Sequence, residues 1–597
     1  MTFYFEKFED RKPPEPLKNS IVRENIWQFL ATCNIIFGSW YIIWRWNHSI
    51  NYDNFIFSII LIFAETFSFI GLVFFIYNLW SVNDYEIKPP PKNFSECINN
   101  PSEDDNRPVR VDLFIATYSE EEELVRLSIK DAKNIKYPHN IDLQIHILDD
   151  GRRPSMKQVC DEEGINYITR NNNIGFKAGN MRNAMEKTFG DFIVICDADT
   201  RVFPTILENT MGYFKDPDVA WVQTPQWFYD IPEGEKLRFW LKKKIGFIGY
   251  YFGLLIESIF GDIMIGADPF VNDPKLFYDV ILRRRNGANA SFCCGAGSIH
   301  RREAVMEASL KAYSEQISKF VAKETKSVPQ ELKKDLEEVM TKEVSLDTEH
   351  TPYKFHVSED IYTSIVLHSD PDRNWKSVLH PSVESKMLSP QDLYSWSVQR
   401  FKYAGGTLDI ALNDNPIFRE GLSHKQKLMY GATVWSYFSG IWNVIFLVYP
   451  IIYMFTAISP VSANAHDFYI HALPFFITNE ISFMIGTWGI NSFPGKAGYL
   501  SFFPLNLMAI WTVLKGEKIK FPVTPKDRQE GNFFKLVIPQ FLIILFTFLG
   551  IIYSFSMYFI GKTENLTGIF VNSLWGINNI FCMAGIVYSA FWKPEEA

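Results

Sequence analysis

Long apolar runs lie toward both ends of the chain, and a polar, charged stretch separates them. Each run is long enough for a helix to cross a bilayer, which takes roughly 20 residues. The runs that we interpret as membrane-crossing helices cover residues 26–44, 55–80, 432–455, 466–488, 534–558 and 568–591. The pattern therefore predicts a soluble domain with two membrane helices before it and four after it.

The polar middle of the chain alternates short apolar runs with longer mixed stretches. Strands are predicted over 111–116, 142–148, 167–170 and 192–196, and helices over 121–135, 154–163 and 178–188. This alternation is typical of an α/β domain, in which helices cover both faces of a mostly parallel sheet. Ligands bind such a sheet at the carboxyl ends of its strands.

The same pattern predicts the domain boundaries. We expect a cytosolic tail over 1–25, two transmembrane helices within 26–82, a linker over 83–108, a catalytic domain over 109–425 with a helical insertion at 309–355, and four transmembrane helices within 426–597 with an interfacial helix at 498–515. The N-terminal tail carries five Lys and Arg residues, whereas the predicted loop 45–53 carries only Arg45. The positive-inside rule then places the tail and the α/β domain in the cytoplasm.

Composition adds two exclusions. The net charge of −9 gives no indication of a nucleic-acid partner. The seven Cys residues contain no C-x-x-C spacing, so the sequence predicts neither a zinc site nor a disulfide framework.

Candidate chemistry begins where the strand over 192–196 runs directly into Asp197 and Asp199. Two carboxylates at i and i+2 near a strand end can converge on one divalent cation. A bound cation can take up the negative charge that develops on a diphosphate leaving group. Taken alone, such a pair more often marks a helix N-cap with a neighbouring surface acid. Thr117 and Tyr118, and Asp149 and Asp150, also follow predicted strands, which favours a shared site.

A set of motifs then appears in a characteristic order: Thr117-Tyr118-Ser119-Glu120, Asp149-Asp150-Gly151, Lys177-Ala178-Gly179-Asn180, Asp197-Ala198-Asp199, Val222-Gln223-Thr224-Pro225, Phe292-Cys293-Cys294-Gly295, Ser358-Glu359-Asp360, Gln399-Arg400-Phe401-Lys402-Tyr403 and Phe521-Pro522-Val523-Thr524-Pro525-Lys526. Together with the flanking apolar runs, the set resembles the processive, membrane-embedded family 2 glycosyltransferases of the cellulose synthase type.

The resemblance implies a GT-A-like domain in the plasma (inner) membrane that polymerises a β-glucan from UDP-glucose and passes the chain through its own helices. It implies Mg²⁺ or Mn²⁺ at Asp197 and Asp199, and a gating loop over 518–530; accessory subunits stay open as partners. The donor-binding residues that it implies are Thr117, Tyr118, Glu120, Asp149, Lys177, Gln399, Arg400, Lys402, Thr524 and Lys526. The acceptor-binding residues that it implies are Phe292, Cys294, Gly295, Glu359 and Tyr403.

Asp360 is the candidate general base, because a carboxylate close to the acceptor hydroxyl can remove its proton during attack. One base and direct attack imply inversion at the anomeric carbon. Ser358 replaces the Thr of the family pattern and keeps its hydroxyl, although Ser followed by acids is also an ordinary helix start.

The largest departure from the family pattern Q-x-x-R-W is Lys402 in place of Arg and Tyr403 in place of Trp. Lys loses the bidentate fork of Arg, and Tyr offers a smaller flat face. These changes leave a β-1,4, β-1,3 or mixed linkage open. There are three competing hypotheses. The protein could be a synthase of another polymer of the chitin, hyaluronan or mannan type, an enzyme that transfers one sugar to a lipid, or a transporter.

Overall fold

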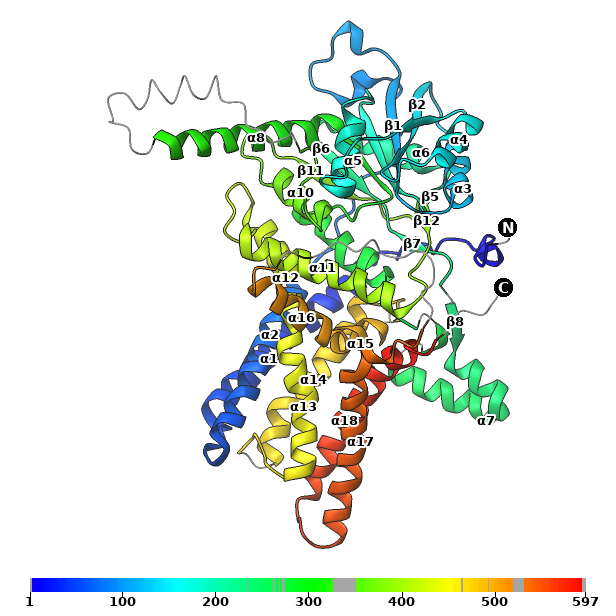
Figure 1. Cartoon of the computed structure of the whole chain (residues 1–597). Helices are drawn as coiled ribbons and strands as arrows, with labels where there is room; N and C mark the ends of the chain where they lie inside the picture. The colour runs from blue at the N-terminus through cyan, green and yellow to red at the C-terminus, as the bar shows by residue number, and fades with distance from the viewer. Residues whose placement is uncertain are drawn as a thin grey trace.

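A strand-and-helix domain and a bundle of long helices make up the two ends of the molecule (Figure 1). The structure, a computed structural model, describes residues 3–231, 233–260, 263–267, 269–270, 274–325, 351–462, 465–491, 493–517, 519 and 531–592. Most of the insertion predicted at 309–355 and most of the gating loop predicted at 518–530 lie outside the described residues.

The domain is built on a seven-stranded sheet of order β11-β6-β10-β4-β1-β2-β3. Its strands are β1 Val109–Thr117, β2 Ile141–Asp149, β3 Asn166–Ile168, β4 Phe192–Asp197, β6 Val219–Gln223, β10 Ser298–Arg301 and β11 Lys376–Leu379. Strand β10 runs antiparallel to both of its neighbours, and the other pairs are parallel. A smaller sheet joins β5 Arg201–Val202, β12 Ser385–Met387 and β7 Trp227–Phe228. The predicted α/β domain with a mostly parallel sheet is therefore confirmed.

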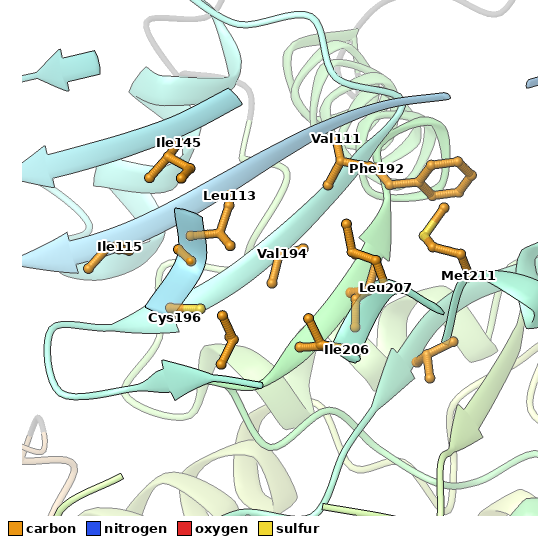
Figure 2. Packing of buried hydrophobic residues seen from close by; sticks show 14 of the residues in the cluster. Val111, Leu113, Ile115, Ile145, Phe192, Val194, Cys196, Ile206, Leu207 and Met211 are labelled. Carbon is orange, nitrogen blue, oxygen red and sulfur yellow. The ribbon is translucent and has the colours of Figure 1, made fainter. Parts of the chain in front are cut away.

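Helices cover both faces of the sheet, because successive strand residues point to opposite sides. Along β1, Val111, Leu113 and Ile115 join one buried cluster, whereas Phe114 joins the other. Figure 2 shows the first cluster, in which these side chains pack against Phe192 and its neighbours. Its helices are α3 Glu122–Lys133, α4 Pro154–Glu163 and α6 Ile206–Thr210; the opposite face is covered by α5 Phe176–Met185, α8 Arg302–Glu324 and α10 Glu359–His368.

Six helices are long and apolar enough to cross a membrane, counted over the residues that the structure describes. They are α1 Ile21–His48, α2 Phe55–Leu79, α13 Ser439–Thr456, α14 Ala465–Gly486, α17 Ile538–Phe559 and α18 Leu566–Ser589. They lie where the sequence predicted its six crossings, but a separate helix, α12 His424–Tyr437, occupies the start of the third predicted run. The region predicted as an interfacial helix forms α15 Phe493–Ser501 and α16 Phe503–Leu514, bent by 46° relative to each other. Its position at the membrane surface stays a prediction.

We predicted Arg45 in the loop after the first helix. It lies instead in the last turn of α1, which continues to His48. Its guanidinium is fully buried and pairs with Glu65 of α2, with Nε 2.6 Å from Oε2. A buried charge needs such a partner, because its desolvation is otherwise uncompensated. The short connection between the first two helices therefore lacks the positive charge that we counted there.

The first residues pack against the α/β domain and are not a free tail. Phe5 is 2% exposed and joins a buried cluster with Leu124 and Tyr229. The Glu9 carboxylate accepts from Tyr229 and pairs with Arg201 and Lys386. Parts of the predicted linker also pack on the domain, since Cys97 lies in the core cluster and Tyr85 and Phe94 pack against it. The boundaries at 25 and 108 thus separate segments that fold together.

Candidate functional site

The carboxyl ends of β1, β2 and β4 meet at one edge of the sheet. In the strand register, Thr117 lies opposite Asp149, and Ala116 lies opposite Asp197. Neighbouring strands are about 4.8 Å apart, so the polar residues that end these strands are neighbours. The structure therefore brings together the three strand ends that the sequence singled out.

One group of residues at this edge satisfies its own polar atoms. The buried Asp149 carboxylate accepts from Gly151 N at 3.0 Å, from Arg153 N at 2.7 Å and from the Tyr167 hydroxyl at 3.0 Å. Arg153 also donates to Thr117 Oγ1 at 2.8 Å. We call Thr117, Glu120, Asp149, Arg153 and Tyr167 the strand-end network.

Glu120 closes the strand-end network from the loop after β1. Its Oε2 accepts from Thr117 Oγ1 and Tyr118 N, both at 2.8 Å, and from Ser119 N at 3.2 Å. Tyr118 itself is 46% exposed, so its ring is open to solvent. Gly151 allows the two loops to approach, because a Cβ there would lie 2.2 Å from Tyr118 O.

Sequence reasoning missed Arg153 and Tyr167, and also missed how Asp150 is used. Arg170 binds the Asp150 carboxylate through two nitrogens, at 2.6 and 2.7 Å, and donates to the carbonyls of Ile174 and Phe176. This pair fixes the segment that leads into α5, and α5 carries Lys177. Two adjacent Arg residues after the acidic motif were a signal in the sequence. Their partners include Asn173 and Thr117, which are distant along the chain.

A second group gathers charges that are close to one another and only partly buried. Lys177 Nζ lies 2.5 Å from Asp197 Oδ1, and the Asp197 side chain is 45% exposed. Glu359 and Asp360, in the first turn of α10, interact electrostatically with both residues. We call Lys177, Asp197, Glu359 and Asp360 the charged cluster.

The charges of this cluster shift one another's protonation. Burial disfavours the Lys177 ammonium, but Asp197, Glu359 and Asp360 outweigh that effect and raise the pKa of Lys177. Burial, followed by the charge of Asp360, raises the pKa of Glu359 to about 8. Burial also raises the pKa of Asp360, although Lys177 acts in the opposite direction. Perturbed pKa values of this kind are common at reaction sites.

A small cavity of about 20 Å³ lies against the charged cluster. Its lining includes Lys177, Gly295, Glu359 and Asp360. A volume of that size holds about one water molecule. An ideal Cβ on Gly295 would lie 3.8 Å from Asp360 Oδ2, so this backbone lies close to the carboxylate, and its φ of +88° favours glycine.

The residues predicted to hold the acceptor lie next to this cavity, which Gly295 lines. Cys294 N donates to Gln223 Oε1 at 2.8 Å, and its carbonyl accepts from Gln226 at 2.9 Å. Phe292 is 9% exposed and lies under the Arg285 guanidinium, 5.3 Å from its ring centroid. Gln223 and Arg285 were not predicted as site residues, although Gln223 stands in one of the quoted motifs.

Helix α11, Leu393–Asn413, carries Gln399, Arg400, Lys402 and Tyr403. It packs closely on the start of α10, since a Cβ on Gly406 would lie 2.1 Å from Ser358 Oγ. Tyr403 is 43% exposed and interacts electrostatically with Arg400, Asp360 and Cys294. Arg400 lies between aromatic rings, 5.7 Å from Trp396 and 5.8 Å from Phe502. Gln399 and Lys402 are half-buried on the same helix.

The two acids of the metal motif differ in their surroundings. Asp197 belongs to the charged cluster, whereas Asp199 is 3% exposed and interacts with Tyr4 of the N-terminal segment. A turn joins them, with Thr200 N donating to Asp197 O at 3.0 Å. Among the described residues, no group of three or more His, Cys, Asp and Glu side chains forms a complete metal cage. Two carboxylates still fit Mg²⁺ or Mn²⁺, because substrate phosphates and water usually supply the remaining oxygens. Thr524 and Lys526 lie outside the described residues.

Known proteins are similar to this chain both in the α/β domain and in the flanking helices. Residues 112–308 match the family model described as "Glycosyl transferase family 2". The chain is 24% identical over 579 residues to the UDP-forming cellulose synthase catalytic subunit of Pseudomonas fluorescens (strain SBW25), covering 94% of this chain and 66% of that protein. It is 28% identical over 410 residues to the corresponding subunit of Xanthomonas axonopodis pv. citri (strain 306), covering 68% and 45%.

The chain therefore spans at most about two thirds of the length of these relatives. Among solved structures, the mannosyltransferase PcManGT from Pyrobaculum calidifontis is 12% identical, with a TM-score of 0.42, covering 77% of this chain and 100% of that one. The six apolar helices and the relatives indicate an integral membrane protein. The chain thus contains a family 2 glycosyltransferase domain set between membrane helices, and it is similar to the catalytic subunits of bacterial cellulose synthases.

Proposed function

We propose that the protein is a processive, inverting β-glucan synthase that elongates the non-reducing end of its product with glucose from UDP-glucose. The proposal includes passage of the polymer across the plasma membrane, with the catalytic domain in the cytoplasm. The observation that carries it is the convergence of Lys177, Asp197, Glu359 and Asp360 at the carboxyl edge of the sheet.

The strand-end network suits the nucleoside end of the donor. Its buried Asp149 is already hydrogen-bonded by Arg153 and Tyr167, so the carboxylate and the loops around it are fixed before the donor arrives. A preorganised site binds with less loss of conformational entropy. The proposal assigns Thr117, Tyr118 and Glu120 to the same part of the site, because all three take part in or adjoin this network.

The charged cluster suits the diphosphate. A divalent cation held by Asp197 and Asp199 would supply Lewis-acid stabilisation of the leaving group when bound. Lys177, already 2.5 Å from Asp197, adds positive charge at the same place. Arg400 and Lys402, on α11, are further candidate contacts for the phosphates.

Asp360 is suited to act as the general base. In the proposed step, the acceptor hydroxyl oxygen attacks the anomeric carbon, and the carbon–oxygen bond to the diphosphate breaks with its electron pair leaving on UDP. Asp360 accepts the hydroxyl proton. Attack from the face opposite the leaving group converts an α-linked donor into a β-linked product. A base with a raised pKa is better matched to a proton transfer near neutral pH.

Tyr403 stands in the place of the family Trp. This replacement bears on the linkage of the product more than on the type of reaction. The exposed Tyr403 ring lies near Asp360 and Cys294, where a terminal sugar would stack. Because this ring is smaller than an indole, the acceptor sugar can present a different hydroxyl to the base. The proposal therefore covers β-1,4, β-1,3 and mixed linkages.

The decisive experiment uses the full-length protein in lipid nanodiscs. Single nucleotide sugars are supplied with Mg²⁺ or Mn²⁺, and both nucleotide release and polymer are measured, followed by linkage analysis. We expect UDP release and a β-glucan from UDP-glucose alone. Polymer from another donor would replace the sugar assignment with a chitin-, hyaluronan- or mannan-type synthase. A single sugar on lipid, or sugar uptake without nucleotide release, would refute processive synthesis.

A further inference from the structure

A helical hairpin leaves the α/β domain next to the membrane helices. Strands β8 Glu233–Lys236 and β9 Met264–Ala267 pair antiparallel and carry α7 Leu237–Phe260 between them. Helix α7 is broken at Ile245 and Gly246, and Gly246 has φ of +68°. The break divides α7 into two arms, residues 237–244 and 247–260. The proposed reaction assigns no role to this hairpin.

The two arms hold each other through backbone contact and one ion pair. A Cβ on Gly249 would lie 2.4 Å from Leu241 O, and one on Gly253 would lie 2.5 Å from Arg238 Cα. Arg238 Nε lies 3.3 Å from Glu257 Oε2, and the Glu257 side chain is 3% exposed. Gly249, Gly253 and the Arg238–Glu257 pair thus lie on the inside of the hairpin.

The outside of the hairpin is apolar and open. Ile248 is 81% exposed, the largest value in a set of exposed apolar side chains that also includes Phe239, Ile245, Phe247, Tyr251, Phe252 and Leu255. A group of seven exposed apolar side chains on one hairpin is costly in water, and such a group usually marks a contact with a partner or a membrane.

The tip of the first arm is basic. Lys242, Lys243 and Lys244 are consecutive and exposed. Their ammonium groups stay near aromatic or acidic neighbours on the hairpin itself, for example Lys244 over the Trp240 ring at 5.8 Å and Lys243 at 2.8 Å from Glu235. A helix with exposed aromatic and aliphatic residues next to lysines is typical of segments that lie in the membrane interface.

The base of the hairpin fixes its height relative to the bundle. Phe270, just beyond β9, is 2% exposed and lies 5.6 Å from Trp592, which follows the end of α18. It also packs in one cluster with Ile586 and Ala590. In Figure 1, α7 projects sideways beside the part of α17 and α18 that is nearest to the α/β domain. The base of the hairpin therefore lies beside the C-terminal end of α18.

We infer that α7 is an interfacial anchor, whose apolar outer surface inserts into the cytoplasmic leaflet while Lys242, Lys243 and Lys244 contact anionic lipid headgroups. Apolar burial and lysine–phosphate attraction act together in such a segment. The anchor would hold the α/β domain at a fixed distance from the membrane, independently of the reaction that the domain performs.

The test measures whether α7 touches lipid in the intact protein. Ile248→Cys is labelled with an environment-sensitive fluorophore in full-length protein in nanodiscs, and quenching by lipids brominated near the headgroup is recorded. Ile248 is open, so this change removes no packed contact. Asp104→Cys is the matched control, because Asp104 is an exposed residue of the short helix Glu103–Asp105 that precedes β1 of the α/β domain. The unsubstituted chain gives the labelling background of its native thiols.

We expect the brominated lipids to reduce the fluorescence at position 248 by about twofold or more, and to leave position 104 unchanged. The reduction should be larger with phosphatidylglycerol than with phosphatidylcholine alone. The triple change Lys242→Gln, Lys243→Gln, Lys244→Gln should remove that lipid dependence. No quenching at position 248 would overturn the anchor, whether the label is exposed to aqueous iodide or shielded by a second copy of the chain. Unchanged lipid dependence in the triple variant would refute the role of the lysines.

Discussion

The strand-end network and the charged cluster lie at the same edge of the sheet but differ in how their carboxyl groups are stabilised. Asp149 is fully buried, yet each of its oxygens accepts hydrogen bonds from groups fixed by neighbouring strands and loops. Glu359 and Asp360 place two carboxyl groups in one partly buried site, and both interact electrostatically with Lys177. The network stabilises its own fold, whereas the cluster keeps electrostatic strain.

This difference indicates what each region is for. A recognition site benefits from donors and acceptors that are already in position. A site that must accept a proton needs a carboxyl group whose protonation can change near the working pH. The predictions below test this contrast, beginning with the largest effect.

Asp360→Asn should reduce turnover by about 10²–10⁴-fold, because it removes the proposed base while preserving the size of the side chain. UDP release from UDP-glucose measures the loss, and UDP binding by calorimetry should stay unchanged. Asp372→Asn is the control, since Asp372 is an exposed acid just after the same helix. A loss smaller than about tenfold would exclude Asp360 as the general base.

Asp149→Ala should destabilise the α/β domain by about 3–5 kcal/mol, because Arg153 loses its buried carboxylate partner. The Tyr167 hydroxyl and the Gly151 amide lose the same acceptor. Thermal unfolding followed by circular dichroism measures the change. Asp142→Ala, at the exposed start of the same strand, should cost less than about 0.5 kcal/mol. Equal effects of the two changes would contradict a preorganised network.

Lys177→Met should shift the acid limb of the pH–rate profile upward by about one unit or more, because Lys177 opposes the rise in the pKa of Asp360. Asp360 then needs a higher pH to ionise and act as a base. The measurement is kcat against pH at saturating donor. Lys177→Arg keeps the charge and should keep the limb in place, and Lys187→Met, an exposed lysine just beyond the same helix, should change nothing. A profile of Lys177→Met that overlays the wild type would argue against the charged cluster.

Glu359→Gln should stabilise the protein above pH 8. Burial and Asp360 raise the pKa of Glu359 from 4.5 to about 8, so the folded state binds more protons than the unfolded state between these values. Stability from this group is therefore lost as pH rises from about 4.5 to 8 and stays low above that. Gln cannot ionise, so the variant should lose this decline and gain at least about 1.4 kcal/mol at pH 8.5, the equivalent of one pKa unit. Melting temperatures from pH 5 to 9 give the comparison; identical slopes for both proteins would refute the strained pair.

Much of the fold follows from local patterns in the sequence. The helix over Pro154–Glu163 was predicted to the residue, and the strand over Phe192–Asp197 to within one. Periodicity and helix starts are properties of neighbouring residues, so both can be recognised in the sequence without knowledge of the fold. The six apolar runs are equally local, although run length could not reveal that α12 ends and α13 begins between Tyr437 and Ser439.

The site was predictable as a set of residues but not as a set of interactions. Motif order identified Asp149, Asp197 and Asp360, and the parallel topology brings the first two to one edge. Tyr167 was missed because its bond to Asp149 depends on the alignment of β2 with β3. Arg153 was missed because its bond to Thr117 depends on the alignment of β1 with β2. The burial of Phe5 was missed because a polar N-terminal stretch gives no local indication of the surface it will cover.

By itself, the sequence determined the alternation of strands and helices, the apolar spans and the identity of the acids, since each is encoded within a few neighbouring residues. Only the tertiary structure decided which acids lie close together with raised pKa values and which have their oxygens satisfied by hydrogen bonds. Those outcomes depend on distances between segments far apart along the chain, and electrostatic energy is set by distance and burial, not by order in the sequence.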